Sequence, residues 1–163
     1  MLFILYLFPL YSQEKSAPYK YWMTFELYGS NNNISLGAAY SFSAGEYFYK
    51  AGYFTRSAFS LWDKMIVDNT GHYYKCINIC IGKRYQFEWF QAAFFAGPAY
   101  VFGEKEVKNS IYKNYNTAGL QTDIQLLFRI ADEIGIGAGL YCNLNFEQPY
   151  AGININLAFG NGK

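Results

Sequence analysis

Apolar and polar residues alternate along residues 133–146, whose sequence is EIGIGAGLYCNLNF. One set of alternate positions, from Ile134 to Phe146, is entirely apolar, whereas the other set holds three glycines, a tyrosine and two asparagines. Such alternation predicts a β-strand with two different faces. Because glycine weakens a strand and a face in water usually carries charge, the three glycines on one face need a reason of their own.

Similar patterns recur in eight segments, which are rich in aromatic and β-branched residues and bounded by Gly, Asn, Asp and Ser. No segment shows an amphipathic helical period, so we predict an all-β fold. Pro98, inside the fifth segment, cannot donate a ladder hydrogen bond, and we expect it at a bulge or near the outer rim. The predicted strands are residues 21–28, 34–42, 47–59, 73–85, 89–102, 117–130, 134–146 and 150–159.

The polar faces of these segments carry little charge. In the last segment, Ile153, Ile155 and Leu157 share one face, and Asn154 and Asn156 share the other. A water-soluble barrel would point its apolar face inward and present a charged face to solvent. Most charged residues of this chain instead lie in the links or near strand ends, so we predict apolar faces in lipid and polar faces inside.

Composition supports a β-protein that meets lipid. Aromatic residues make up 21% of the 163-residue chain and charged residues 15%, compared with about 25% charged residues in soluble domains. The net charge of +1 gives no basic surface for nucleic acid. No stretch approaches the roughly 20 apolar residues of a spanning helix. We therefore predict one domain, a single closed antiparallel transmembrane β-barrel of eight strands.

The lengths of the links predict which strand ends face outward. Links 60–72 and 103–116 are long, whereas the links after the second, fourth and sixth strands are short. Outer-membrane barrels combine short periplasmic turns with longer external loops, so we expect the two long links outside. Because side chains fill the interior of an eight-stranded barrel, we expect Gly135, Gly137 and Gly139 to make room for long neighbours such as Arg129.

The N-terminal residues MLFILYLFPLYS resemble the apolar region of a secretory signal. We interpret residues 1–12 as a truncated signal peptide, 13–20 as an extension, 21–160 as the barrel and 161–163 as a tail. The odd number of cysteines gives no disulfide framework. Cys76 and Cys80 would lie about 13 Å apart on a strand, which is too far to bridge. We interpret them and Cys142 as small apolar residues and expect no metal site and no cofactor.

The leader, the eight-strand pattern and the closing segment YAGININLAFGNGK resemble the small outer-membrane β-barrels of Gram-negative bacteria. The closing segment alternates apolar residues up to Phe159, although many such barrels end on their last aromatic and here residues 160–163 follow. The resemblance implies location in the cell outer membrane and contact with outer-membrane lipid and lipopolysaccharide. It also implies delivery by the barrel assembly machinery, and we expect a monomer that binds no nucleic acid.

Some barrels of this kind modify lipid A, and a hydrolase would need a nucleophile, a base and an orienting acid. His72 is the only histidine, and Ser57, Ser60 and Asp63 lie on the other side of the same link. No His-x-Ser pair shares a strand face, as a lipid A deacylase of this shape should show. We therefore predict no catalytic residues and no enzyme activity, and keep the deacylase as an alternative.

Charged residues within the predicted strands must be paired if they are buried. Since so narrow a barrel offers no aqueous channel, we interpret them as a polar network that fills the interior rather than as an ion path. Aromatic residues of the long links, Trp62, Tyr112 and Tyr115, are candidates for surface contact. The charged residues of the network are Glu26, Lys50, Arg56, Arg84, Asp123 and Arg129.

The predicted function is thus a structural or surface-interaction role in the outer membrane. Two soluble alternatives remain open at this point. One is a lipocalin-like barrel that holds an apolar ligand, and the other is a periplasmic β-sandwich.

Overall fold

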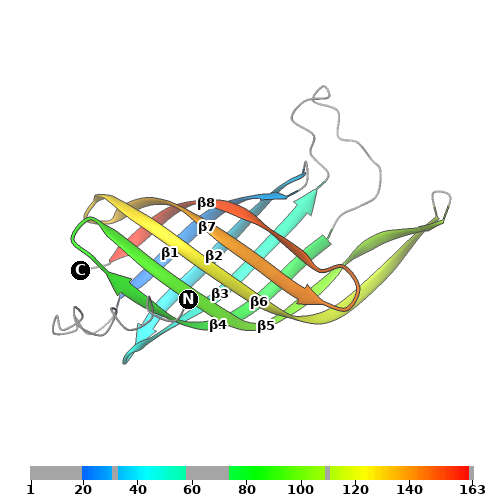
Figure 1. The fold of residues 1–163 in the computed structure, drawn as a ribbon, viewed down its shortest axis with the longest axis horizontal. Helices are drawn as coiled ribbons and strands as arrows, with labels where there is room; N and C mark the ends of the chain where they lie inside the picture. The colour runs from blue at the N-terminus through cyan, green and yellow to red at the C-terminus, as the bar shows by residue number, and fades with distance from the viewer. Residues whose placement is uncertain (1–19, 31–32, 58–73, 109–110, 162–163) are drawn as a thin grey trace, which may run out of the picture.

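The computed structural model describes residues 20–30, 33–57, 74–108 and 111–161, and these form one closed antiparallel β-barrel (Figure 1). Each strand pairs with the next, and β8 pairs back with β1. The strands are β1 (Tyr21–Ser30), β2 (Asn33–Ala44), β3 (Tyr47–Ser57), β4 (Tyr74–Gln86), β5 (Phe90–Lys108), β6 (Ile111–Ala131), β7 (Ile134–Asn145) and β8 (Tyr150–Asn161). The prediction of an all-β, eight-stranded closed barrel is confirmed. Across the described residues, no helix has the length and apolar character needed to cross a membrane.

The two ends of the barrel differ in their links. The start of β1, the end of β8 and the links 45–46, 87–89 and 132–133 lie at one end, which we call the turn end. Gly45 in the first of these turns has a φ of +63°, a left-handed conformation that glycine adopts without steric cost. The strand ends Ser30, Ser57, Lys108 and Asn145 lie at the opposite end, together with the link 146–149, and we call this the loop end.

The alternation of the sequence becomes an outer and an inner surface. Apolar side chains such as Ile79, which is 63% exposed, and Ile153 face outward around the barrel. Polar side chains such as Glu26, Asn143 and Asn156 are buried inside. This arrangement is the reverse of a soluble barrel and leaves no unpaired backbone edge along the closed wall, as a membrane span requires.

The β5–β6 hairpin is longer than the sequence pattern predicts. The pattern predicts a loop over 103–116, but β5 continues to Lys108 and β6 begins at Ile111, with Glu104 opposite Asn114 and Lys105 opposite Lys113. Figure 1 shows this hairpin reaching beyond the other strands at the loop end. A ribbon outside the membrane needs no apolar face. Its sequence is therefore charged and lacks the apolar–polar alternation from which a strand is predicted.

Pro98 lies in mid-span and not near the outer rim. It pairs with Leu120 of β6, but the β4–β5 register is interrupted between the pairs Asn78–Ala99 and Ile81–Ala96. Because proline has no N–H to donate, the ladder is interrupted on the side where that donor would be needed. The register on either side of the gap is unchanged, so the wall stays closed.

The glycines of β7 make room for side chains of the neighbouring strands. A Cβ on Gly139 would lie 2.4 Å from Oδ1 of Asn154, and one on Gly137 would lie 2.8 Å from a methyl group of Leu127. These neighbours come from the strands on either side of β7. The glycine face of 134–145 therefore lets longer side chains of β6 and β8 cross the interior above it.

Candidate functional site

A buried ion network occupies the middle of the barrel interior. Nζ of Lys50 lies 2.8 Å from Oε1 of Glu26 and also pairs with Oδ2 of Asp123. The amide of Gln125 donates to both carboxylates, at 3.1 Å to Glu26 and 2.8 Å to Asp123. Glu26 further accepts hydrogen bonds from the hydroxyl groups of Thr24 and Tyr28. Strands β1, β3 and β6 are thereby tied together across the interior.

The burial of this network determines what it can do. Glu26 and Asp123 are each only 2% exposed, and Lys50 is 5% exposed. Charges removed from water in this way need partners, and here one ammonium group serves two carboxylates. The network therefore fixes the barrel interior rather than exposing a reactive group to a substrate.

Arg84 lies nearer the turn end and is held by aromatic rings and one hydroxyl group. Its guanidinium carbon lies 4.6 Å from the ring centre of Phe48 and 5.7 Å from that of Trp22. Its Nη2 donates to Oγ of Ser41 at 3.3 Å. The two ring contacts and this single hydrogen bond indicate that cation–π interactions contribute most to the stabilisation of Arg84.

An aromatic cluster fills the interior at the loop end. The rings of Tyr28 and Phe54 have centres 5.0 Å apart, and those of Tyr74 and Tyr150 have centres 4.7 Å apart. Tyr141 lies edge-on to Tyr28 at 4.6 Å. The five rings come from β1, β3, β4, β7 and β8 and are all buried. Together with the ion network they fill the interior with side chains.

The β7–β8 link is braced against the base of the long hairpin. Oδ1 of Asn145 accepts hydrogen bonds from the backbone N–H groups of Glu147 and Gln148, at 3.1 and 2.7 Å. The hydroxyl group of Tyr115 in β6 donates to Oε1 of Gln148 at 3.1 Å. Phe146, within the same link, is 98% exposed. The backbone of this link is thus held by hydrogen bonds, and Phe146 within it is exposed at the loop end.

Only some of the charged residues predicted to form an interior network meet in the structure. Glu26, Lys50 and Asp123 meet in one network, whereas Arg84 lies apart from it. Tyr115, expected on a loop surface, is buried because its ring points inward from β6 and its hydroxyl group reaches Gln148.

The remaining predicted residues are described only in part or not at all. Arg129 is half-buried in β6, opposite Gly135. Arg56 and Tyr112 lie within β3 and β6, where only their backbones are described. Trp62 and His72 lie outside the described residues, as do Ser60 and Asp63.

Sequence reasoning missed Gln125, Thr24 and Tyr28 as members of the ion network. All three occupy inward-facing positions of predicted strands, and their parity with Glu26 or Asp123 is visible in the sequence. Their contacts with one another depend on how far β1, β3 and β6 are staggered on closing the barrel. No pattern within a single strand carries that information.

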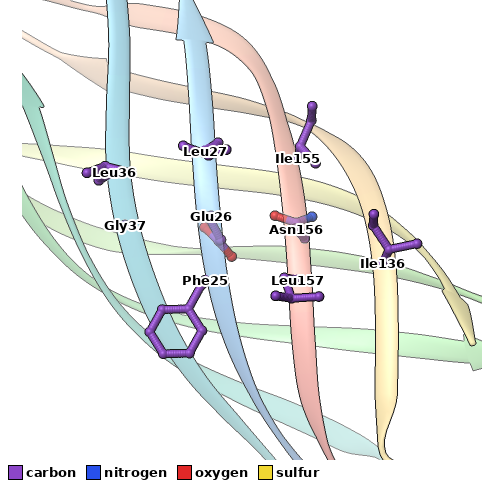
Figure 2. A pocket seen from close by; sticks show the side chains of 9 residues that line it. All are labelled: Phe25, Glu26, Leu27, Leu36, Gly37, Ile136, Ile155, Asn156 and Leu157. Atoms are coloured by element: carbon purple, nitrogen blue, oxygen red, sulfur yellow. The ribbon is translucent and has the colours of Figure 1, made fainter. Parts of the chain in front are cut away.

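The described residues hold no cluster of three or more His, Cys, Asp or Glu side chains that could bind a metal ion. One hollow of about 460 Å³ lies on the outer wall over β1, β2, β7 and β8. Figure 2 shows apolar side chains such as Phe25, Leu36 and Ile155 around it, with Glu26 and Asn156 on neighbouring strands behind. This hollow belongs to the apolar outer surface and presents no reactive group.

No protein-family model matches the sequence, and neither does any curated protein. Several solved structures share the fold. The N-terminal β-barrel domain of Pseudomonas aeruginosa OprF matches with a TM-score of 0.63 at 8% identity, over 87% of this chain and 96% of that domain. The Yersinia pestis attachment invasion locus protein Ail matches with a TM-score of 0.56 at 8% identity, over 87% and 96%. Neisserial surface protein A matches with a TM-score of 0.55 at 8% identity, over 87% and 92%.

These similarities concern the fold, and the outer surface of this chain agrees with them. A closed wall whose outward side chains are apolar and whose polar side chains are buried inside is suited to a lipid bilayer. The chain is an eight-stranded β-barrel with the fold of small outer-membrane barrels and with an apolar outer surface suited to a lipid bilayer.

Proposed function

We propose that this protein is a non-catalytic barrel of the outer membrane, with a structural role in the wall and a contact role at the loop end. The proposal rests on the contrast between the barrel interior and the loop end. The interior is filled by the ion network and the aromatic cluster, while a two-stranded ribbon and an exposed phenylalanine project at the loop end.

The filled interior argues for structure and against transport. In mid-span Lys50 forms ion pairs with both Glu26 and Asp123, and the aromatic cluster lies between this network and the loop end. An eight-stranded barrel is only wide enough for such side chains. We infer that the interior charges stabilise the closed wall, that the protein is a monomer, and that its lipid neighbours include lipopolysaccharide. We further infer that the barrel assembly machinery inserts it.

The projecting hairpin argues for contact with something outside the wall. Loops and ribbons held on a rigid scaffold are where binding residues concentrate. Ail, one of the similar structures, is described as an attachment invasion locus protein and has been solved with the heparin analogue sucrose octasulfate. The described loop end of this chain mixes Lys75 and Lys113 with Glu104 and Glu147. That mixture supports contact in general rather than a polysulfate ligand.

The experiment is to fold the purified chain into phospholipid vesicles and nanodiscs and to follow it by heat-modifiable gel mobility. Folded protein should migrate differently before and after boiling, and carbonate should not extract it. Incubation with lipid A and phospholipid, followed by mass spectrometry, should show no release of acyl chains. Acyl release that disappears in His72→Ala would overturn the non-catalytic role, and extraction by carbonate would overturn the membrane location.

A further inference from the structure

Within the described part of the chain, the projecting hairpin has two edges that pair with no further strand. The last pair between β6 and β7 joins Gly119 to Asn145, so within the described residues 111–118 of β6 pair only with β5. The last pair between β5 and β4 joins Gly103 to Tyr74, so among the described strands residues 104–108 of β5 pair with β6 alone. At the rise of a β-strand, residues 111–118 offer an edge of about 27 Å.

The sequence protects these two edges unequally. Residues 104–108 of β5, with the sequence EKEVK, carry four charges, and charged residues on an edge discourage pairing with another chain. Residues 111–118 of β6, with the sequence IYKNYNTA, carry one charge, that of Lys113. Ile111 is 65% exposed, and Asn114 and Asn116 are exposed too. The β6 edge is therefore the one left open to another strand.

The base of the β6 edge is rigid. Tyr115 is fixed to Gln148, and Gln148 is fixed in turn to Asn145, so the link 146–149 and the ribbon hold each other in place. Phe146 follows Asn145 directly and faces outward beside the start of the free edge. Backbone that is already held by such hydrogen bonds loses less conformational entropy when a partner binds.

We propose that the β6 edge, residues 111–118, binds an extended acidic and apolar segment of a partner protein by β-strand addition. This inference rests on the proposed contact role and names the class of partner. The added strand takes the place that β7 holds lower on the wall, so it runs antiparallel to β6. Main-chain hydrogen bonds hold it, and side chains on alternate positions select its sequence.

The register determines which side chains the partner must carry. An apolar residue opposite Asn116 lies on the outward face beside Phe146, because positions 116 and 118 share that face. Three residues later the partner faces Lys113 and needs an acidic side chain. Two residues after that it faces Ile111 and needs an apolar one. The expected pattern is thus apolar, any, any, acidic, any, apolar.

A second copy in the same membrane fits this edge less well than a partner segment does. Two copies in one bilayer point the same way, so their β6 strands cannot run antiparallel to each other. A free segment of another protein has no such restriction. We therefore assign the edge to a partner, and the experiment also tests for self-association.

The test uses the folded full chain in nanodiscs, with an acetylated and amidated peptide of sequence SLTTETVS as the probe. Backbone amide shifts are followed by NMR, which detects millimolar affinity. We expect shifts confined to residues 111–118 and Phe146. A peptide N-methylated on the residues whose N–H groups face β6 should not bind, whereas one N-methylated on the alternate residues should bind.

Charge reversal is the matched control. The wild-type chain should prefer SLTTETVS to SLTTKTVS by up to about fivefold, and Lys113→Glu should reverse that preference. Replacing residues 106–112 by Asn-Gly joins Lys105 to Lys113, which already pair, and removes Ile111 from the edge; it should weaken binding while heat-modifiable mobility is kept.

Three outcomes would overturn the assignment: no shifts at millimolar peptide, equal binding of both N-methylated peptides, or concentration-dependent shifts of residues 111–118 without peptide. Heat-modifiable mobility is measured in the same sample before peptide is added. A failure of membrane insertion is therefore seen separately from a failure of the edge to bind.

Discussion

Substitution of Lys50 by methionine would leave two carboxylates buried without their shared ammonium group. The structure gives Lys50 ion pairs with Glu26 and Asp123, each only 2% exposed. Breaking a buried ion pair by removing one partner typically costs about 3–5 kcal/mol, because the remaining charge stays out of water. Gln125 still donates to both carboxylates, but an amide does not neutralise their charge. We therefore expect Lys50→Met to lower the free energy of unfolding by about 3–5 kcal/mol.

The assay is urea unfolding of the barrel in phospholipid vesicles, followed by tryptophan fluorescence and by heat-modifiable mobility. Lys83→Met is the matched control, because Lys83 is exposed and its described contact is a cation–π contact with Tyr47 at 5.3 Å. That control should change stability by no more than about 1 kcal/mol.

A variant that neutralises the whole network separates charge from shape. Glu26→Gln, Lys50→Met and Asp123→Asn together remove all three charges at nearly constant volume. Replacing a buried ion network by neutral residues is often close to neutral in stability, so this triple variant should be more stable than Lys50→Met alone. The reasoning is refuted if Lys50→Met loses less than about 1 kcal/mol, or if the triple variant is the less stable of the two.

Three further predictions concern the wall, and each is measured by the same unfolding assay. Gly139→Ala would place a Cβ 2.4 Å from the carbonyl oxygen of Ile124 and should lower the free energy of unfolding by about 1–3 kcal/mol. Gly29→Ala, whose Cβ would have its nearest contact at 3.7 Å, should lower it far less. Equal losses of stability in the two variants would contradict the packing argument. Phe54→Ala removes a ring that contacts Tyr28, Tyr74 and Tyr150 and should cost about 3–5 kcal/mol; a loss near zero would show that the aromatic cluster is not packed. Ile155→Arg puts a charge on the outward face in mid-strand and should lower the free energy of unfolding by about 2–4 kcal/mol. Asn114→Arg, on the projecting ribbon, should leave it almost unchanged. Equal effects on stability would argue that Ile155 does not face lipid.

The alternation of side chains is enough to predict the wall. In β7, Ile136, Ala138 and Leu140 alternate with glycines and so predict an apolar outward face, and all three side chains are indeed exposed on the outside of the barrel. β7 and β8 start at the predicted residues because the polar links 132–133 and 147–149 interrupt the pattern there. The alternation of apolar and polar residues is a property of each strand alone, so the outward face of a strand can be predicted from the sequence of that strand.

Contacts across the interior are not local, and the sequence pattern does not predict them. Lys50 meets Asp123 from 73 positions away, and the stagger of the closed sheet decides that they lie at the same height. The same stagger puts Asn154, and not Arg129, over Gly139. The β5–β6 ribbon escapes prediction for another reason. Residues such as Glu104 and Lys113 lie beyond the wall, where neither face must be apolar, so the period that marks a strand is absent.

The pairing of β1 with β8 has a consequence for the order in which the barrel can assemble. Met23 of β1 lies opposite Phe159 of β8. One edge of β1 therefore gains its backbone hydrogen bonds only when β8, the last strand, is in place. A nascent chain that lacks β8 would carry two open edges, and each unsatisfied backbone group costs several kcal/mol in hydrocarbon. Strands that entered the bilayer one by one without assistance would therefore leave open edges in hydrocarbon. The β1–β8 pairs join the two ends of the described chain, and such non-local pairs are the kind that slows folding.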